Sequence, residues 1–208
     1  MNNMSKAFGI VNFAGNHIQV DGLQAYRPVG ALSFLGRYRT IDFPISNMSN
    51  SGIDNIEVYV RRKPRSLTEH LGTGRHYNIN SKRGQLNIMY TENNRIGDIY
   101  STDVAAYIEN MDCIERIHLP YVVIAPSYMV YTADYSTFLS EHIESGADIS
   151  MMYHSVDNAK EAFLNCNTLN INKQKGVLSI EPNHGNAKNK NISMDTYVMK
   201  KDLFIELL

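Results

Sequence analysis

Four basic residues within five positions form the most concentrated cluster of positive charge in this sequence. Arg61, Arg62, Lys63 and Arg65 follow a run of apolar and β-branched residues at 55–60. Guanidinium groups bind phosphate oxygens through paired hydrogen bonds, so the cluster predicts an anion site for a phosphorylated effector. A charged contact with another subunit and a plain solvated loop are the alternatives, because basic clusters often lie on a surface without a ligand.

A second group of charged residues lies upstream. Arg37 and Arg39 flank Tyr38, and Asp42 follows three residues later. An arginine that close to a carboxylate readily forms an ion pair. We expect one of the two arginines to pair with Asp42 and brace the loop, rather than to contact a ligand.

Composition excludes several classes of protein. With 43% hydrophobic and 20% charged residues, the sequence is typical of a globular protein. The net charge of −1 gives no bias toward nucleic acid or an anionic membrane. Cys113 and Cys166 have neither metal-ligand spacing nor the number that a disulfide scaffold needs. No apolar run approaches the ~20 residues that span a bilayer and no secretory signal is evident, so a cytoplasmic protein is expected.

Short apolar or β-branched runs alternate with helical patterns, which predicts an α/β fold with a largely parallel sheet. Strands are predicted at 6–13, 55–60, 85–90, 121–125, 148–156 and 192–199. Helices are predicted at 47–51, 66–71, 102–117 and 134–145, and a hairpin within 168–180 adds an antiparallel element. Ser66 and Glu69 form a capping-box pattern at the start of the second helix. We find no internal repeat and predict one domain over residues 1–208.

A long segment carries a resemblance to a known family. Residues 36–56 read GRYRTIDFPISNMSNSGIDNI. This segment resembles the G-[KR]-[YF]-R-x-I-D-F-x-[IL]-S-N-x-x-N-S-G-I pattern of bacterial glucose-1-phosphate adenylyltransferases, which make ADP-glucose. Further matches run through most of the chain: Ser66-Leu67, His70-Leu71, Asn110-Met111-Asp112, 121–124, Asp134-Tyr135, Ser193-Met194 and Tyr197.

The resemblance implies a Rossmann-like nucleotidyltransferase domain with flanking helices. Full-length members of this family continue into a left-handed β-helix domain and assemble as tetramers. This sequence ends on apolar residues at 203–208, as if inside a helix, and stops before any β-helix. We therefore expect it to be a fragment of a longer chain.

The sequence departs from the family at the phosphate loop. The family's G-G-x-G-T-R-L, with arginine at the variable position, aligns on residues 14–20, and of its glycines Gly15 alone remains. The two arginine positions hold Asn16 and Gln19. Glycines in such a loop let backbone N–H groups approach phosphate, and the arginines balance charge. Asparagine and glutamine donate hydrogen bonds without bringing charge.

Two further positions lose charge. The family's R-A-K-P aligns on residues 27–30, so its lysine is replaced by Val29. Its G-D-H aligns on residues 127–129, which places Tyr128 where the aspartate would hold Mg²⁺. Tyr128 would either plug the nucleotide pocket or stack on an adenine.

The resemblance also assigns binding residues. Gly15, Asn16 and Gln19 are the candidates for nucleotide contact. Glu181, Ser193 and Asp195 lie where family members contact the sugar phosphate, although the lysine of the family's E-K-P is missing after Glu181. Effector or anion binding is assigned to Arg27, Arg61, Arg62 and Arg65.

These substitutions make the sequence similar to the catalytically deficient D-type subunit found beside a catalytic subunit in many Gram-positive bacteria. Removing one preorganised charge stabiliser costs about 10²–10³ in rate, and here four charged positions have changed. The resemblance then implies a regulatory or assembly subunit without metal or cofactor, paired in a heterotetramer with a catalytic subunit that holds Mg²⁺. A sugar phosphate or nucleotide is the expected effector. The alternatives are an active sugar-nucleotide transferase that uses Arg27 or Lys188, and a pure effector-binding module.

Overall fold

The computed structural model describes residues 6–13, 22–23, 27–60, 63–72, 74–79, 84–90 and 103–208. The chain divides into two compact units. Unit 1 comprises Met1–Ile149 with Val198–Leu208, and unit 2 comprises Ser150–Tyr197. Each unit is described by itself.

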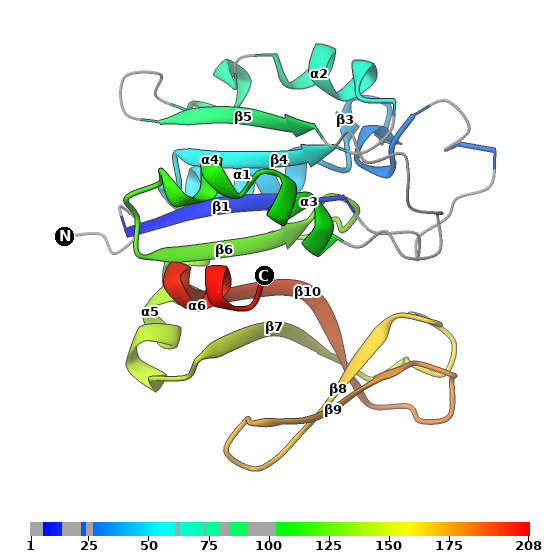
Figure 1. The fold of residues 1–208 in the computed structure, drawn as a ribbon. Coiled ribbons are helices and arrows are strands. Elements are labelled where there is room, and N and C mark those ends of the chain that lie inside the picture. The colour runs from blue at the N-terminus through cyan, green and yellow to red at the C-terminus, as the bar shows by residue number, and fades with distance from the viewer. Residues whose placement is uncertain are drawn as a thin grey trace. The chain divides into compact units, whose positions relative to one another are not determined.

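Unit 1 is built on four parallel strands. They lie side by side in the order β5 (Gln85–Tyr90), β4 (Asn55–Val60), β1 (Ala7–Asn12) and β6 (Tyr121–Pro126), as Figure 1 shows. Strands β4, β1 and β6 are apolar and buried along almost their whole length, which is typical of a parallel sheet covered on both faces. The strands predicted in these four places are confirmed.

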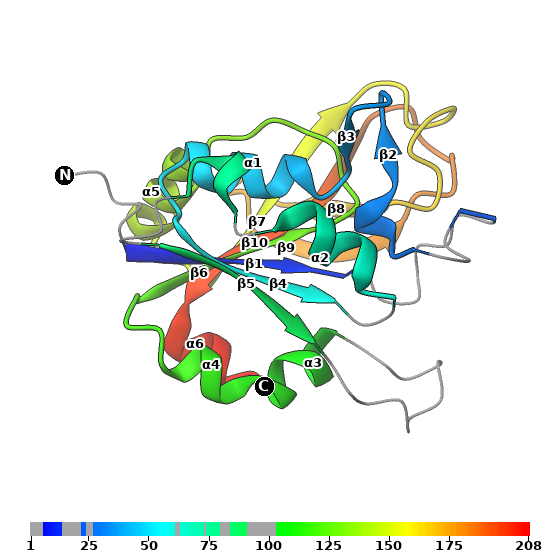
Figure 2. The ribbon, with the colours of Figure 1, turned by 90° about the horizontal axis from the view of Figure 1, so that it is seen from above.

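Helices cover both faces of this sheet. Figure 2 shows α1 (Asp42–Asn50) and α5 (Tyr135–Ser145) on one face, and α3 (Asp103–Glu109), α4 (Met111–Glu115) and α6 (Lys201–Glu206) on the other. The smaller elements of unit 1 are α2 (Arg65–Leu71), the 3₁₀ helices η2 (Val29–Ala31) and η3 (Arg75–Tyr77), and the antiparallel pair β2 (Ser33–Phe34) and β3 (Tyr38–Arg39). The predicted Rossmann-like α/β class is confirmed.

Two predicted helices differ from the observed ones. Helix α1 begins five residues earlier than expected, because Pro44 lies in its first turn, where proline is tolerated. The predicted helix over 102–117 is two helices, α3 and α4, separated at Asn110. The side-chain amide of Asn110 donates to the carbonyl oxygen of Ala106 at 3.0 Å and so competes with the regular helical pattern.

Helix α2 occurs where it was predicted, but the predicted capping box was wrong. The helix begins at Arg65, and its N-cap residue Pro64 makes no side-chain cap bond. Glu69 pairs with the guanidinium of Arg65, with 2.8 Å between Oε1 and Nε, so it does not reach back to Ser66. The end of α5 agrees with the prediction, because Gly146 terminates it in the left-handed conformation with φ 64°.

Unit 2 is formed by antiparallel strands. Strand β10 (Lys190–Lys200) pairs with both β7 (Ile149–Val156) and β8 (Asn167–Ile171), and β8 pairs with β9 (Val177–Pro182). The connection between β8 and β9 is a tight turn in which the side-chain oxygen of Asn172 accepts from the backbone of Gly176 at 2.8 Å. The predicted hairpin is confirmed.

The core of unit 1 lies between the sheet and its helices. The Tyr59 ring on β4 packs edge-on against Tyr107 of α3 at 4.9 Å, and Tyr107 packs on Phe204 of α6 at 5.3 Å. On the opposite face of the sheet, a side chain at Gly9 would collide with Met48, so this glycine lets α1 approach β1 closely.

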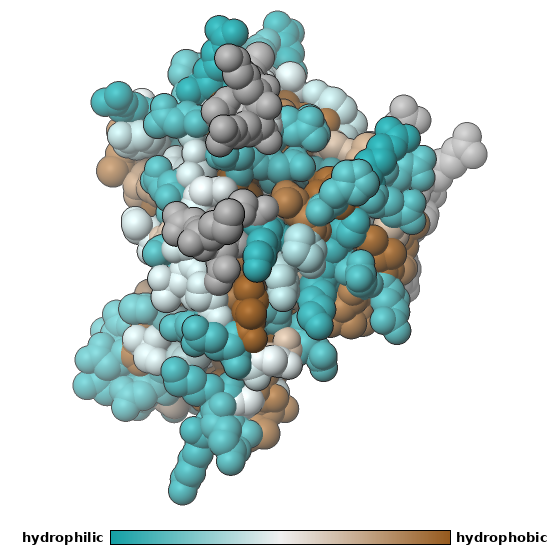
Figure 3. All heavy atoms as spheres, turned by 90° about the vertical axis from the view of Figure 1, so that its left-hand side faces the viewer, coloured by the Kyte–Doolittle hydropathy of each residue, from teal (hydrophilic) through white to brown (hydrophobic). Residues whose placement is uncertain are grey.

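The molecular surface drawn in Figure 3 is mainly hydrophilic, with hydrophobic residues in small separate groups.

Candidate functional site

The predicted nucleotide site lies at the carboxyl ends of β1 and β6. Ligands of open α/β sheets usually bind beyond the carboxyl ends of the strands. Here the backbone of Ser127, just after β6, donates to the carbonyl oxygen of Asn12, the last residue of β1, at 3.1 Å. A Cβ placed on Gly30 of η2 would lie 3.1 Å from Cβ of Ser127. The segments that carry Val29 and Tyr128 therefore meet at this edge of the sheet.

The segment that resembles the family holds η2 in place. The hydroxyl of Thr40 donates to the carbonyl oxygen of Val29 at 2.9 Å, and the backbone of Ile41 donates to that of Gly30 at 3.1 Å. Val29 is buried, with 7% of its surface exposed. The position that holds lysine in the family is thus part of the packed interior.

The residues after β6 do not suit a magnesium ion. Mg²⁺ prefers carboxylate oxygens and water in octahedral geometry. Buried Ser127 and half-buried Tyr128 offer neutral hydroxyl groups instead. Across the described residues, no three His, Cys, Asp or Glu side chains come together in a way that could hold a metal.

Several predicted residues cannot be placed. Gly15, Asn16 and Gln19 of the phosphate loop, and Arg61 and Arg62 of the basic cluster, lie outside the described residues. Their assignments stay predictions.

The described arginines of the predicted effector site lie on the surface. Arg27 is exposed. The side chain of Arg65 is 90% exposed, and its ion pair is with Glu69 one helical turn away. The structure therefore gives Arg65 a partner that the sequence analysis did not consider.

Asp42 anchors the segment that resembles the family. Its carboxylate accepts from the backbone of Arg39 at 2.8 Å, from Nε2 of His70 at 2.6 Å and from the hydroxyl of Tyr77 at 2.6 Å. Burial and the bond to Asp42 raise the pKa of Tyr77 above its usual range. Asp42 braces this segment as expected, but Arg39 contacts Asp42 through its backbone N–H group. The guanidinium of Arg39 donates to the carbonyl oxygen of Ser66 instead.

In unit 2, two of the predicted sugar-phosphate residues touch each other. The hydroxyl of Ser193 donates to Oδ1 of Asp195 at 2.8 Å and accepts from the backbone of Asp195 at 3.1 Å. Ser193 is buried, and Asp195 adopts the left-handed conformation with φ 44°. Aspartate tolerates this conformation better than most residues, and the two Ser193–Asp195 hydrogen bonds hold it in this part of β10.

The third predicted residue, Glu181, lies on the opposite face of the strands. Thr168 of β8 is directly opposite Ile192 of β10 and directly opposite Glu181 of β9. Directly opposed residues share a face, and neighbouring residues along a strand alternate. Glu181 therefore shares a face with Ile192, whereas Ser193 points to the other. The carboxylate of Glu181 accepts from Asn170 at 3.0 Å on its own face.

Comparison with known proteins agrees with this geometry. The nucleotidyl transferase family matches residues 6–207, nearly the whole chain. The chain belongs to the nucleotidyl transferase family. Among curated relatives, it is 32% identical over 160 residues to the glycogen biosynthesis protein GlgD of Geobacillus stearothermophilus, a match that covers 74% of this chain and 45% of that protein. It is also 32% identical over 171 residues to the glucose-1-phosphate adenylyltransferase of Clostridioides difficile, covering 81% and 43%.

This nucleotidyl transferase chain thus spans less than half the length of these relatives. A similar solved structure is a Bacillus anthracis protein assigned as a glucose-1-phosphate thymidylyltransferase, crystallised with sucrose. Its TM-score is 0.71 at 14% identity, and the match covers 95% of this chain and 73% of that one. The likeness supports the fold. Across the described residues, the helices are too short or too polar to cross a bilayer.

Sequence reasoning missed one feature of this family member, a polar cavity in unit 2. Three stretches line it: residues 154–158, Phe163 and residues 189–191. None of Glu181, Ser193 and Asp195 is part of the lining. The nearest signal in the sequence is the asparagine-rich stretch at 183–191.

Proposed function

We propose that this chain is a regulatory or assembly subunit of a glucose-1-phosphate adenylyltransferase in glycogen biosynthesis, and that it is itself catalytically impaired. That enzyme makes ADP-glucose and pyrophosphate from ATP and glucose 1-phosphate. The observation that carries the proposal is the pair of uncharged residues, buried Val29 and half-buried Tyr128, at the carboxyl end of the unit 1 sheet. The match to GlgD supports the pathway.

The physical argument concerns negative charge. Nucleotidyl transfer builds charge on the phosphates as pyrophosphate leaves, and enzymes stabilise it with cations and metal ions held in place beforehand. A valine and a tyrosine supply neither a positive charge nor an anionic oxygen for Mg²⁺. The loss of both groups at one edge leaves little means to stabilise the reaction.

The proposal specifies partners. We expect a catalytic glucose-1-phosphate adenylyltransferase subunit as the main partner in a heterotetramer, and a sugar phosphate or nucleotide as the effector. ATP-dependent glycogen synthesis takes place in the cytoplasm, so the proposal also places the chain there. Mg²⁺ would be held by the catalytic partner.

The test is a pyrophosphate-release assay with ATP, Mg²⁺ and glucose 1-phosphate. The purified chain alone should turn over at least about 10²-fold more slowly than the Clostridioides difficile relative measured beside it. Co-expression with a catalytic subunit from the same source should yield a stable complex whose activity differs from that of the catalytic subunit alone. Equal turnover by the isolated chain would contradict the proposal.

The second candidate is an active sugar-nucleotide transferase with a non-standard phosphate loop. It is favoured by one observation: identity to a named adenylyltransferase equals identity to GlgD, at 32%. Either Arg27 or Lys188, both exposed, would then supply the positive charge. If the chain alone is active, changing both residues to alanine should abolish that activity, whereas retained turnover would exclude this form of the alternative.

A further inference from the structure

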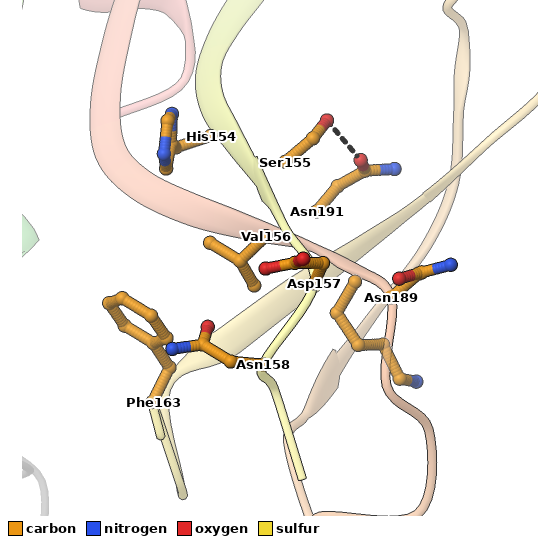
Figure 4. A pocket seen from close by; sticks show the side chains of 9 residues that line it. His154, Ser155, Val156, Asp157, Asn158, Phe163, Asn189 and Asn191 are labelled. Atoms are coloured by element: carbon orange, nitrogen blue, oxygen red, sulfur yellow. Dashed lines mark hydrogen bonds between the residues drawn. The ribbon is translucent and has the colours of Figure 1, made fainter. Parts of the chain in front are cut away.

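The polar cavity of unit 2 has the size of a small-molecule site. Its volume is about 690 Å³, within the roughly 300–1,000 Å³ typical of such sites. Figure 4 shows the carboxylate of Asp157 near the middle of the lining, with Asn158 and Phe163 at one end and Asn189 at the other. The cavity lies wholly within residues of unit 2.

The lining is rich in hydrogen-bonding groups and carries no net formal charge. Asp157 is its one acidic residue and Lys190 its one residue with a permanent positive charge, so the two cancel. The hydroxyl of Ser155 donates to the side-chain oxygen of Asn191 at 2.8 Å, which fixes that amide (Figure 4). The side chains of Asp157 and Asn189 are exposed and make no hydrogen bond to the described part of the chain.

Phe163 provides an apolar surface at the end of this polar group. Its side chain is 43% exposed, and its backbone has φ 57°, in the left-handed region. A large aromatic residue rarely adopts this conformation, and such outliers concentrate at binding sites. The surrounding structure therefore holds a phenyl ring in solvent at the cost of backbone strain.

A buried asparagine fixes the turn that presents this ring. Asn183 is 0% exposed, and its side-chain amide donates to the carbonyl oxygens of Ala159 at 2.8 Å and Phe163 at 3.0 Å. The backbone of Ala159 donates in turn to Lys188 at 3.0 Å, which joins the turn to the segment that leads into β10. A buried and fully bonded amide of this kind rigidifies its surroundings, so the site is preorganised.

From this combination we propose that the cavity binds a neutral sugar, a hexose that is either free or part of an oligosaccharide. A hexose ring has an apolar C–H face that suits an exposed phenyl ring, and a rim of hydroxyl groups that suits carboxylate and amide side chains. A phosphorylated ligand would need several positive charges, whereas this lining offers one lysine balanced by Asp157. The proposal does not depend on the proposed function, which is based on unit 1.

The experiment is calorimetric titration of the purified chain with glucose and, separately, with maltotriose. At least one of the two should bind saturably with a Kd of about 10 mM or tighter. Tighter binding of glucose supports a free hexose, and tighter binding of maltotriose supports an oligosaccharide. Glucose 1-phosphate and inorganic phosphate serve as charged comparisons.

Three variants connect binding to the cavity. Phe163→Asn removes the ring but tolerates the left-handed backbone, so the protein should fold at least as well as the parent. Phe163→Asn and Asp157→Ala should each weaken sugar binding by about tenfold or more. Leu164→Ala, a matched change of an exposed apolar neighbour outside the lining, should leave binding unchanged.

Three results would overturn the proposal. The first is that neither neutral sugar binds saturably at concentrations well above the expected Kd of about 10 mM. The second is sugar binding that persists in both Phe163→Asn and Asp157→Ala while thermal unfolding shows that these variants are folded. The third is that inorganic phosphate or glucose 1-phosphate binds more tightly than the neutral sugars, and that Phe163→Asn abolishes this anion binding.

Discussion

The carboxyl end of the unit 1 sheet and the strands of unit 2 differ in the groups they retain. In unit 1, Val29 and Tyr128 stand where the resemblance places a lysine and an aspartate. In unit 2, Ser193 matches the family, and its hydroxyl is bonded to Asp195. Phosphoryl transfer requires formal charge, whereas sugar recognition uses neutral hydrogen-bonding groups. Under the proposed function, the charged groups needed for phosphoryl transfer would be missing from unit 1, while neutral hydrogen-bonding groups remain in unit 2.

Each unit also contains one polar residue that organises its functional segment. Asp42 in unit 1 accepts from Arg39, His70 and Tyr77, and fixes the segment that supports η2. Asn183 in unit 2 fixes the turn beside the cavity. The hydrogen-bonded scaffold around Asp42 is therefore in place although Val29 and Tyr128 carry no charge, as the proposed assembly role requires.

The largest expected effect comes from restoring charge to unit 1. The quadruple variant Asn16→Arg, Gln19→Arg, Val29→Lys and Tyr128→Asp should raise Mg²⁺-dependent pyrophosphate release by about 10²-fold or more over the parent. The physical reason is that it returns three positive charges and one metal ligand to the positions that the resemblance assigns to them. Activity is measured with and without Mg²⁺.

Tyr128→Phe is the matched control for this variant. It removes the hydroxyl but adds no ligand for Mg²⁺, so no activity should appear. If the quadruple variant folds but is as inactive as the parent, the missing charged residues do not account for low activity, and the contrast drawn between the two units is wrong.

A large loss of stability is expected when Asn183 is truncated. Asn183→Ala would leave the buried carbonyl oxygen of Ala159 without its donor and remove one of the two donors to that of Phe163, which should lower the free energy of unfolding by about 2–4 kcal/mol. Urea denaturation of the purified chain measures this change. Asn170→Ala is the control, because Asn170 bonds to exposed Glu181 and its loss should cost about 1 kcal/mol or less. Similar losses for both variants would mean that the cavity turn is not specially stabilised.

The sequence predicted those parts of the fold that depend on local pattern. Strands β1, β4, β5 and β6 are runs of apolar residues, and the Lys175-Gly176 turn of the hairpin has a clear local signal. The start of α1 was missed: the helix includes Pro44 in its first turn, where proline is tolerated.

The candidate sites were predictable in part. Ser193 and Asp195 were assigned by resemblance and lie in contact, but the assignment gave no information about the face on which Glu181 lies. That depends on which residues oppose each other across β10, β8 and β9, which no single strand reveals. The cavity was missed for the same reason, because its lining combines three stretches that are separate in sequence.

The buried carboxyl group of Glu57 should make the stability of the chain depend on pH. Glu57 on β4 is 1% exposed, and burial raises the pKa of its carboxyl group, while the hydroxyl of Tyr59 at 2.9 Å partly offsets that rise. The folded state therefore binds this proton more tightly than the unfolded state. The free energy of unfolding should fall as pH rises from the ordinary pKa of the acid, about 4.5, through the raised value.

Glu57→Gln isolates this contribution, because glutamine keeps the shape and does not ionise. The variant should match the parent near pH 4 and become the more stable of the two as pH rises, as measured by urea denaturation at a series of pH values. Parallel pH profiles for Glu57→Gln and the parent would show that the buried carboxyl does not titrate in this range.

The smallest effect is expected at Arg65, whose ion pair with Glu69 is fully in solvent. Exposed pairs of this kind contribute little to stability, so the thermal midpoint of Arg65→Ala should equal that of the parent within error. Anion binding is the more sensitive measurement. If the basic cluster binds a sugar bisphosphate, Arg65→Ala should weaken that binding by about twofold or more, and Glu69→Ala should strengthen it, because it frees the same guanidinium from a competing carboxylate. Opposite shifts from these two neighbouring exposed residues would assign the anion to this part of unit 1, and identical binding in both variants would leave Arg65 as a solvated side chain.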